Sequence, residues 1–307
     1  MRRILVWGLV LGVWTVAPFS GAGAAPKGEV LENLQYRVDI LGLPELVHAG
    51  VVLKSAGPGR YQAELRGEAK GILAPLSGHR QDTYATEMVF RDGRLLPLVY
   101  REESQHRGKR RLKEYRFNYQ AGTVEMWQPK KGQLVRNWQK KLTGPMYDPL
   151  SAFYNCRLGL FGPLAPGETL KVTGIPYPRP EEYHVRLGSQ SKEGGQAMVS
   201  IPNEVFDKKQ GVVFVDFDAA RVPTKAWTRI LGCGKVVGQL LPTSQTLKGG
   251  LPEMGGTGRS GSKRGSKQRP GAASAVISFS PSLAKSPGND YLMISSQRTG
   301  ESAAGSP

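Results

Sequence analysis

Cysteine and histidine are scarce in this chain of 307 residues, which has two cysteines and four histidines. The histidines are scattered along the sequence as His48, His79, His106 and His184. No two histidines or cysteines stand at the spacing of a metal-binding pair. Cys156 and Cys233 do not form a C-x-x-C motif, so a redox-catalytic pair is not expected. We therefore predict no metal site and no bound cofactor.

The motifs of common hydrolases and phosphate-binding enzymes are also missing. Ser151 lacks the flanking glycines of a nucleophile elbow between strand and helix. The adjacent pairs Glu102–Glu103 and Glu181–Glu182 would point to opposite faces of a strand, which disfavours a shared role as acid and base. We predict that the protein has no catalytic residues and is not an enzyme, with an unrecognised hydrolase as the remaining alternative.

Long hydrophobic runs are missing as well. The run from Ile4 to Ala17 is shorter than the roughly 20 residues of a membrane-spanning helix, which disfavours a membrane anchor. It follows Arg2 and Arg3 and precedes a stretch of small residues, which is the plan of a secretory signal peptide. We predict that residues 1–24 are removed on export and that the mature protein is located in the periplasm.

Acidic residues are in the minority, with 25 Asp and Glu against 42 Lys and Arg, for a net charge of +17. An exported chain seldom meets nucleic acid, and the densest basic cluster lacks the interleaved aromatics of single-strand binders. We expect instead a lipid or another anionic or amphiphilic component of the envelope as partner. The candidate anion-contact residues are Arg107, Lys109, Arg110 and Arg111. The leading interpretation of this cluster is a solvated hairpin tip that keeps strand edges from aggregating, and anion contact is the alternative.

The composition changes near residue 248, where Gly, Ser, Lys and Arg replace the apolar residues that a core needs. We predict a disordered basic tail over residues 248–307 and one domain over residues 25–247. A domain of about 223 residues can bury enough surface to fold without a metal or a disulfide.

Within this domain, apolar and polar residues alternate with a period of two. Tyr61, Ala63 and Leu65 fall on one face of a strand, and residues 114–119 alternate in the same way. Turn signals separate such runs, which indicates an all-β protein: a long antiparallel meander forming a curved sheet or partly closed barrel. An outer-membrane barrel is the alternative, but residues 101–111 are polar on both faces and do not suit a bilayer.

One short helix is expected near residues 148–158. Asp148 can accept hydrogen bonds as the N-cap, and Pro149 suits the first helical position. Leu150, Tyr154 and Leu158 then recur at helical spacing. In a β protein, an apolar helix is expected to pack on the open end or the concave face of the sheet, so we predict a cover helix.

The two cysteines permit a disulfide, because the chain is predicted to reach an oxidising compartment. A Cys156–Cys233 bridge is therefore one expectation. The other is a pair of buried thiols that never meet.

The order of these segments resembles the exported bacterial domain of unknown function 3108 family. The resemblance covers roughly residues 34–243 and depends on the segments LQYRVDILGLPELV, YATEMVFRDGRLLPLVYREE, DPLSAFYNCR and TRILGCGKVVGQL. It implies an exported β-rich fold like a curved, partly closed barrel, without an established activity. The two cysteines and the basic tail look particular to this chain.

Three functions follow from these observations. The first is a non-catalytic exported protein that binds or carries an apolar or amphiphilic envelope molecule on a concave aromatic face formed by Tyr115, Phe117 and Tyr119. The second is a structural or interaction protein of the envelope with a filled interior, and the third is the hydrolase. The sequence leaves the ligand and the oligomeric state open.

Overall fold

The computed structural model describes residues 28–175, 182–202, 210–230, 234–247 and 250–251. The chain divides into two units, Met1–Arg259 and Ser260–Pro307, and all of the described residues lie in the first. The predicted signal peptide, and the predicted tail apart from residues 250 and 251, therefore lie outside the described residues.

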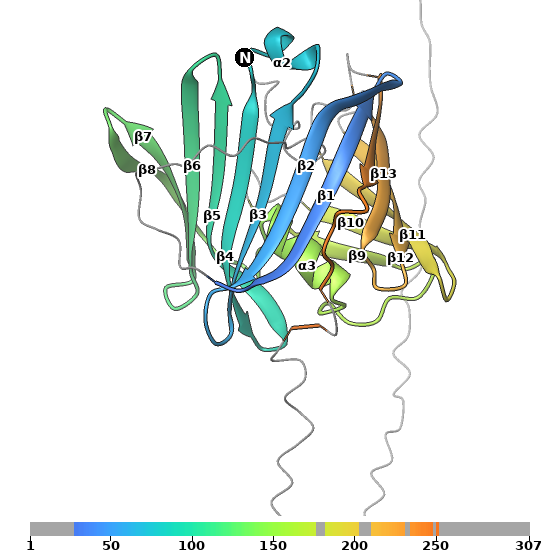
Figure 1. Ribbon diagram of the computed structural model, residues 1–307. Coiled ribbons are helices and arrows are strands. Elements are labelled where there is room, and N and C mark those ends of the chain that lie inside the picture. Colours follow the sequence, from blue (N-terminus) through green and yellow to red (C-terminus); the bar gives the residue numbers. More distant parts are fainter. Residues whose placement is uncertain (1–27, 176–181, 203–209, 231–233, 248–249, 252–307) are drawn as a thin grey trace, which may run out of the picture. The chain divides into compact units, whose positions relative to one another are not determined.

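The described residues form a single antiparallel sheet of fourteen strands (Figure 1). The first eight strands are β1 (Val30–Ile40), β2 (Leu43–Ser55), β3 (Arg60–Ala69), β4 (Gln81–Arg91), β5 (Arg94–His106), β6 (Lys109–Asn118), β7 (Thr123–Lys130) and β8 (Gln133–Lys141). The other six are β9 (Thr169–Thr173), β10 (Glu182–Gln190), β11 (Gly194–Pro202), β12 (Gln210–Asp218), β13 (Pro223–Ile230) and β14 (Gly234–Leu240). The prediction of an all-β antiparallel meander is confirmed.

Tight turns connect the hairpins of the first meander. Both residues of the turns Leu41–Gly42, Asp92–Gly93, Arg107–Gly108 and Lys131–Gly132 have positive φ. This is the backbone of a type I′ turn, whose twist matches that of the flanking strands. Three of these four turns coincide with turn signals in the sequence, and their regular spacing produces the long strands.

The sheet is built from two meanders that join through their outermost strands. β1–β8 follow one another in space, β9–β14 do the same, and β14 pairs with β1 from Tyr36↔Leu240 to Ile40↔Val236. The strands β8 and β9, which are consecutive in the sequence, therefore form the two edges of the sheet. The sheet is not closed and curls around its inner face, as predicted for a partly closed barrel (Figure 1).

The helix α3 (Pro149–Arg157) lies against the inner face of this sheet, on β3, β4 and β5 (Figure 1). Leu150 and Tyr154 of the helix are buried with Leu53, Tyr61 and Met88 of the strands in one apolar cluster. The predicted cover helix is therefore confirmed, and it fills part of the interior.

Inward-facing side chains of both meanders occupy further parts of the interior. Val213 of β12 packs with Val38 and Val47 of β1 and β2, while Val172 of β9 packs with Ala152 of α3. Burial of this apolar surface, at about 25 cal/mol for each Å², is the main source of the free energy that stabilises the curled sheet.

Polar groups fix the position of α3. The Asp148 carboxylate accepts hydrogen bonds from the amides of Leu150 (2.9 Å) and Ser151 (3.1 Å) and from the Thr86 hydroxyl (2.9 Å). Burial raises the pKa of Asp148, although these donors favour its charged form. The Asn155 side chain accepts a hydrogen bond from the Leu95 backbone amide (3.0 Å) and donates one to the Leu95 carbonyl (2.8 Å). Leu95 lies in the part of β5 that does not pair with β6.

Two features of the fold were not anticipated. A second short helix, α2 (Leu73–Leu76), connects β3 to β4. Leu251, which was assigned to the tail, is 2% exposed and packs in the same cluster as α3. The packed domain therefore extends beyond residue 247, at least to Leu251.

Candidate functional site

The predicted aromatic face on β6 lies inside the protein. Tyr115 and Phe117 are 1% and 6% exposed and pack with Met146 and Ile175. Tyr119 is half-buried and stacks on Phe117 with ring centroids 6.4 Å apart. These side chains belong to the hydrophobic core, so a ligand would have to displace packed residues to reach them. Ligand contact by these three residues stays a prediction.

The predicted basic cluster forms the tip of the β5–β6 hairpin. Arg107, Lys109, Arg110 and Arg111 are all exposed, with Arg107 in the turn and the others at the start of β6. Arg110 forms an ion pair with Glu103 at 2.5 Å. The position of the cluster agrees with the hairpin tip that the sequence suggests, and its contact with anions stays a prediction.

Cys156 lies near the end of α3, where burial raises the pKa of its thiol to about 12. A thiol with so high a pKa is a poor nucleophile at neutral pH. Cys233 lies outside the described residues, so the predicted bridge stays a prediction.

Ser151, the candidate nucleophile of the hydrolase alternative, is 0% exposed on α3. Its hydroxyl donates a hydrogen bond to the backbone carbonyl of Asp148 at 3.1 Å, a local contact at the start of the helix. Among the described residues there is also no group of three or more His, Cys, Asp or Glu side chains able to hold a metal ion.

The outer face of the second meander carries an apolar row that the sequence reasoning missed. The strand register aligns Arg186 of β10 with Met198 of β11, Met198 with Phe214 of β12, and Phe214 with Trp227 of β13. We call these four residues the aromatic row. They point outward because their sequence neighbours on β11 and β12, such as Ala197 and Val213, are buried.

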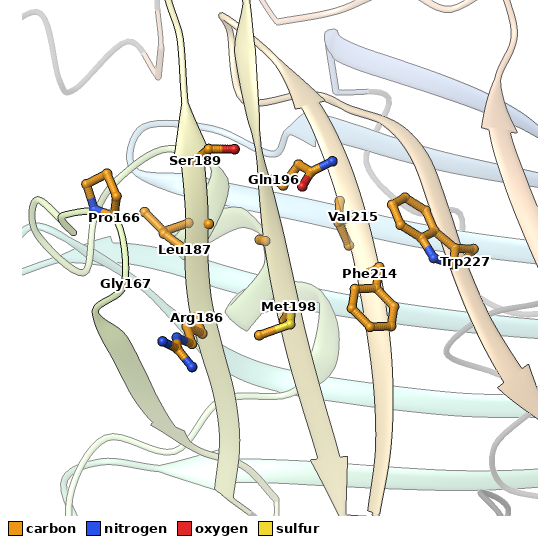
Figure 2. A pocket seen from close by; sticks show the side chains of 12 residues that line it. Pro166, Gly167, Arg186, Leu187, Ser189, Gln196, Met198, Phe214, Val215 and Trp227 are labelled. Atoms are coloured by element: carbon orange, nitrogen blue, oxygen red, sulfur yellow. The ribbon is translucent and has the colours of Figure 1, made fainter.

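The aromatic row is partly exposed to solvent, with Arg186 and Phe214 exposed and Met198 and Trp227 half-buried, and it contains a stacked pair. The rings of Phe214 and Trp227 are 5.5 Å apart and inclined by 12°, and Phe214 is 37% exposed. Met198 lies beside Phe214, and Arg186 projects from the neighbouring strand on the same side (Figure 2). The pair presents a flat apolar surface to the outside of the sheet.

A pocket accompanies this row, and we call it the outer pocket (Figure 2). Its floor is formed by the row and by residues next to it on the same strands, and the segment Pro166–Gly167 lies at one side. The Gly167 amide donates a hydrogen bond to the Leu187 carbonyl at 2.8 Å, which holds this segment against β10. The outer pocket combines an apolar floor with one guanidinium, that of Arg186.

Basic side chains also occupy outward positions elsewhere on the second meander. The outward positions of β9, β13 and β14 hold Lys171, Lys225, Arg229 and Lys235. The Lys225 ammonium lies 5.3 Å from the centroid of the Trp227 ring, a cation–π contact. The apolar floor and the Arg186 guanidinium suit a ligand with an apolar body and a polar or negatively charged group.

The outer face of the first meander has a different character. There Arg101 forms ion pairs with Glu87 (2.9 Å) and Glu114 (2.6 Å), and Arg116 pairs with Glu114 at 2.6 Å. These two arginines outweigh the burial of Glu114 and hold the pKa of its carboxyl below the usual value. Charged, ion-paired side chains therefore occupy the outer face of the first meander. The apolar outer pocket on the second meander differs from this face.

A sequence signal for the outer pocket exists in residues 212–215, VVFV, which are apolar at outward as well as inward positions. A strand with one wet face would alternate there. The partners Met198 and Trp227 come from strands whose register the sequence does not reveal.

Fold and site together define a β-barrel-like protein with an open, curled sheet and a helix inside it. The model of the family described as "Protein of unknown function (DUF3108)" matches residues 35–230, and the chain belongs to this family. No curated protein matches the chain. Among solved structures, the beta-barrel-like protein of domain of unknown function DUF1849 from Brucella abortus is similar, with 12% identity and a TM-score of 0.42. That match covers 69% of this chain and 96% of the other.

Proposed function

We propose that this protein is an exported, non-catalytic binding protein of the cell envelope, and that it binds an apolar or amphiphilic molecule in the outer pocket. The observation that carries this proposal is the stacked pair of the exposed Phe214 and the half-buried Trp227 on the outer face, in a pocket that the Arg186 side chain also lines. Apolar pockets with a few well-placed polar groups are typical of ligand sites. The position differs from the interior face expected from the sequence, because the interior side chains Tyr115 and Phe117 are packed in the core.

A titration of the secreted protein with a fluorescent single-chain fatty acid, below its micelle concentration, tests this proposal. Trp227→Ala should weaken binding at least about fivefold, because a truncated contact aromatic typically costs more than 1 kcal/mol of binding free energy. The matched control is Trp127→Ala, which removes an outward tryptophan from β7, where the Arg116 guanidinium lies 4.5 Å from the ring centroid. Equal loss in both variants would refute the assignment of the site.

A second variant separates the outer pocket from the interior. Phe117→Arg places a charge in the packed core and should destabilise the protein by about 3 kcal/mol or more. If this variant instead kept its stability and lost fatty acid binding, the interior would be the binding site.

Export is tested by sequencing the N-terminus of membrane-free protein. The mature chain should begin at Ala25 or within a few residues of it, and a chain that begins at Met1 would contradict export.

The filled interior also favours a second candidate, a structural or interaction protein of the envelope. A wild-type protein that binds no fatty acid in the titration, and co-purifies with no lipid in native mass spectrometry, would support this candidate instead.

A further inference from the structure

We infer that one end of the curled sheet is a docking surface for a lipid bilayer that contains anionic lipids. This end is formed by the β1–β2 turn, the α2 segment between β3 and β4, and the β5–β6 turn. Successive turns of an antiparallel meander alternate between its ends, so these three lie together (Figure 1). We call them the rim.

The rim holds the most exposed large apolar side chains of the described residues. Leu41 and Leu43 of the β1–β2 turn are 67% and 47% exposed, and Ile72 and Leu76 of the α2 segment are 61% and 74% exposed. A surface that serves only to face water has no need of four aliphatic side chains on its protruding turns. Exposed apolar side chains that gather in this way are typical of membrane or protein contact sites.

The basic hairpin tip belongs to the same surface. The Arg107 amide donates a hydrogen bond to the Gly78 carbonyl at 3.1 Å, and the His106 Nδ1 lies 2.6 Å from the Ser77 carbonyl. These contacts hold the β5–β6 turn against the segment that follows α2.

Three cations of the tip are free to meet an anionic partner. Arg107, Lys109 and Arg111 are exposed, and none of them forms an ion pair with another described residue. The β1–β2 side carries the exposed Glu45, so the positive charge of the rim comes from the tip. Charge and apolar exposure at one end are complementary to an anionic bilayer, in which aliphatic side chains enter the interface and cations stay at the headgroups.

A bilayer suits this surface better than a folded partner does. Leu41 and Leu43 stand on one protruding turn and Ile72 and Leu76 on another, so a rigid partner would need a matching relief, whereas lipid adapts to each side chain. None of the described helices is long and apolar enough to cross a membrane. In the inferred contact, apolar and basic side chains of the rim meet the surface of the bilayer.

Co-sedimentation of the secreted protein with vesicles tests the inference. The protein should bind vesicles of phosphatidylcholine with phosphatidylglycerol and bind pure phosphatidylcholine at least tenfold more weakly. Ile72→Ser with Leu76→Ser should weaken binding at least tenfold, because each removes an aliphatic group from the interface. Ile72 and Leu76 are both exposed, so these substitutions remove little buried area from the fold.

A charge variant tests the second component. Arg107→Gln with Arg111→Gln should weaken binding about 25-fold, at about fivefold for each charge near an anionic surface. The control is Arg60→Gln with Arg91→Gln, which removes the same charge from exposed positions at the opposite end of the sheet. The control should change binding less than fivefold.

Three results would overturn the inference: no binding of wild type to anionic vesicles, equal binding to both vesicle types, or equal effects of the rim and control variants. The last result would assign any binding to net charge alone. Fatty acid binding in the outer pocket should be unchanged in the rim variants, so a failure here leaves the proposed function standing.

Discussion

Loss of one partner of the buried Glu32–Arg157 ion pair should destabilise the protein more than loss of both partners. Arg157 at the end of α3 and Glu32 on β1 approach to 2.5 Å, with side-chain exposures of 3% and 0%. The Glu32 carboxylate also accepts a hydrogen bond from the Leu247 amide at 2.9 Å. Burial raises the pKa of Glu32, against the attraction of Arg157, so desolvation outweighs attraction at this carboxyl.

Breaking this pair should therefore be costly. Arg157→Met leaves a buried carboxylate without its cation and should lower the free energy of unfolding by roughly 3–5 kcal/mol. Replacing both partners, as Glu32→Leu with Arg157→Met, removes both charges from the interior. The double variant should cost less than Arg157→Met alone, at about 1–3 kcal/mol, because both buried charges are gone and the Leu247 amide only loses its acceptor.

The assay is urea unfolding of the four proteins of the cycle, with the slope of the transition checked for constancy. An exposed pair of the same length provides the control: Arg110 and Glu103 also approach to 2.5 Å but are 62% and 35% exposed. Arg110→Met should change the free energy of unfolding by about 1 kcal/mol at most. If Arg157→Met cost no more than Arg110→Met, or if the double variant were as unstable as the single ones, the reasoning from burial would be refuted.

Three further predictions concern stability. Leu251→Ala should cost about 2–4 kcal/mol in unfolding experiments, while deletion of residues 252–307 should leave the thermal midpoint unchanged. Leu150→Asp should cost roughly 3 kcal/mol or more and Ser151→Ala less than about 1 kcal/mol; the reverse order would contradict the cover-helix interpretation. The lowered pKa of Glu114 adds stability above the unfolded value of about 4.5, and this stability is lost as pH falls through the folded pKa, so wild type and Glu114→Gln should converge in acid.

Local signals in the sequence predict the individual elements well. The alternation around Tyr61 and Ala63 corresponds to a strand with one buried face, and Asp148 caps α3 as its sequence context indicates. Such features depend on residues within one element or turn, where spacing and backbone preference decide the structure.

Local sequence signals do not predict contacts between segments that are distant in the chain. The pairing of β1 with β14 joins residues about 200 positions apart, such as Tyr36 and Leu240, and it places both edges of the sheet in the middle of the chain. Glu32 and Arg157 look like ordinary surface charges until that pairing and the inward position of α3 bring them together. The aromatic row depends in the same way on the register of four strands.

The residues that stabilise the fold differ from the residues proposed to contact a ligand or a bilayer, and this difference makes the functional proposals testable. Inward side chains and α3 supply the buried apolar area, whereas Phe214 of the outer pocket and Leu76 of the rim are 37% and 74% exposed and contribute little to the core. Substitutions at these two surfaces should therefore leave the fold intact, because little buried area is lost with them. A loss of fatty acid or vesicle binding in a variant with unchanged stability would then report contact with the ligand or the bilayer, and not damage to the sheet.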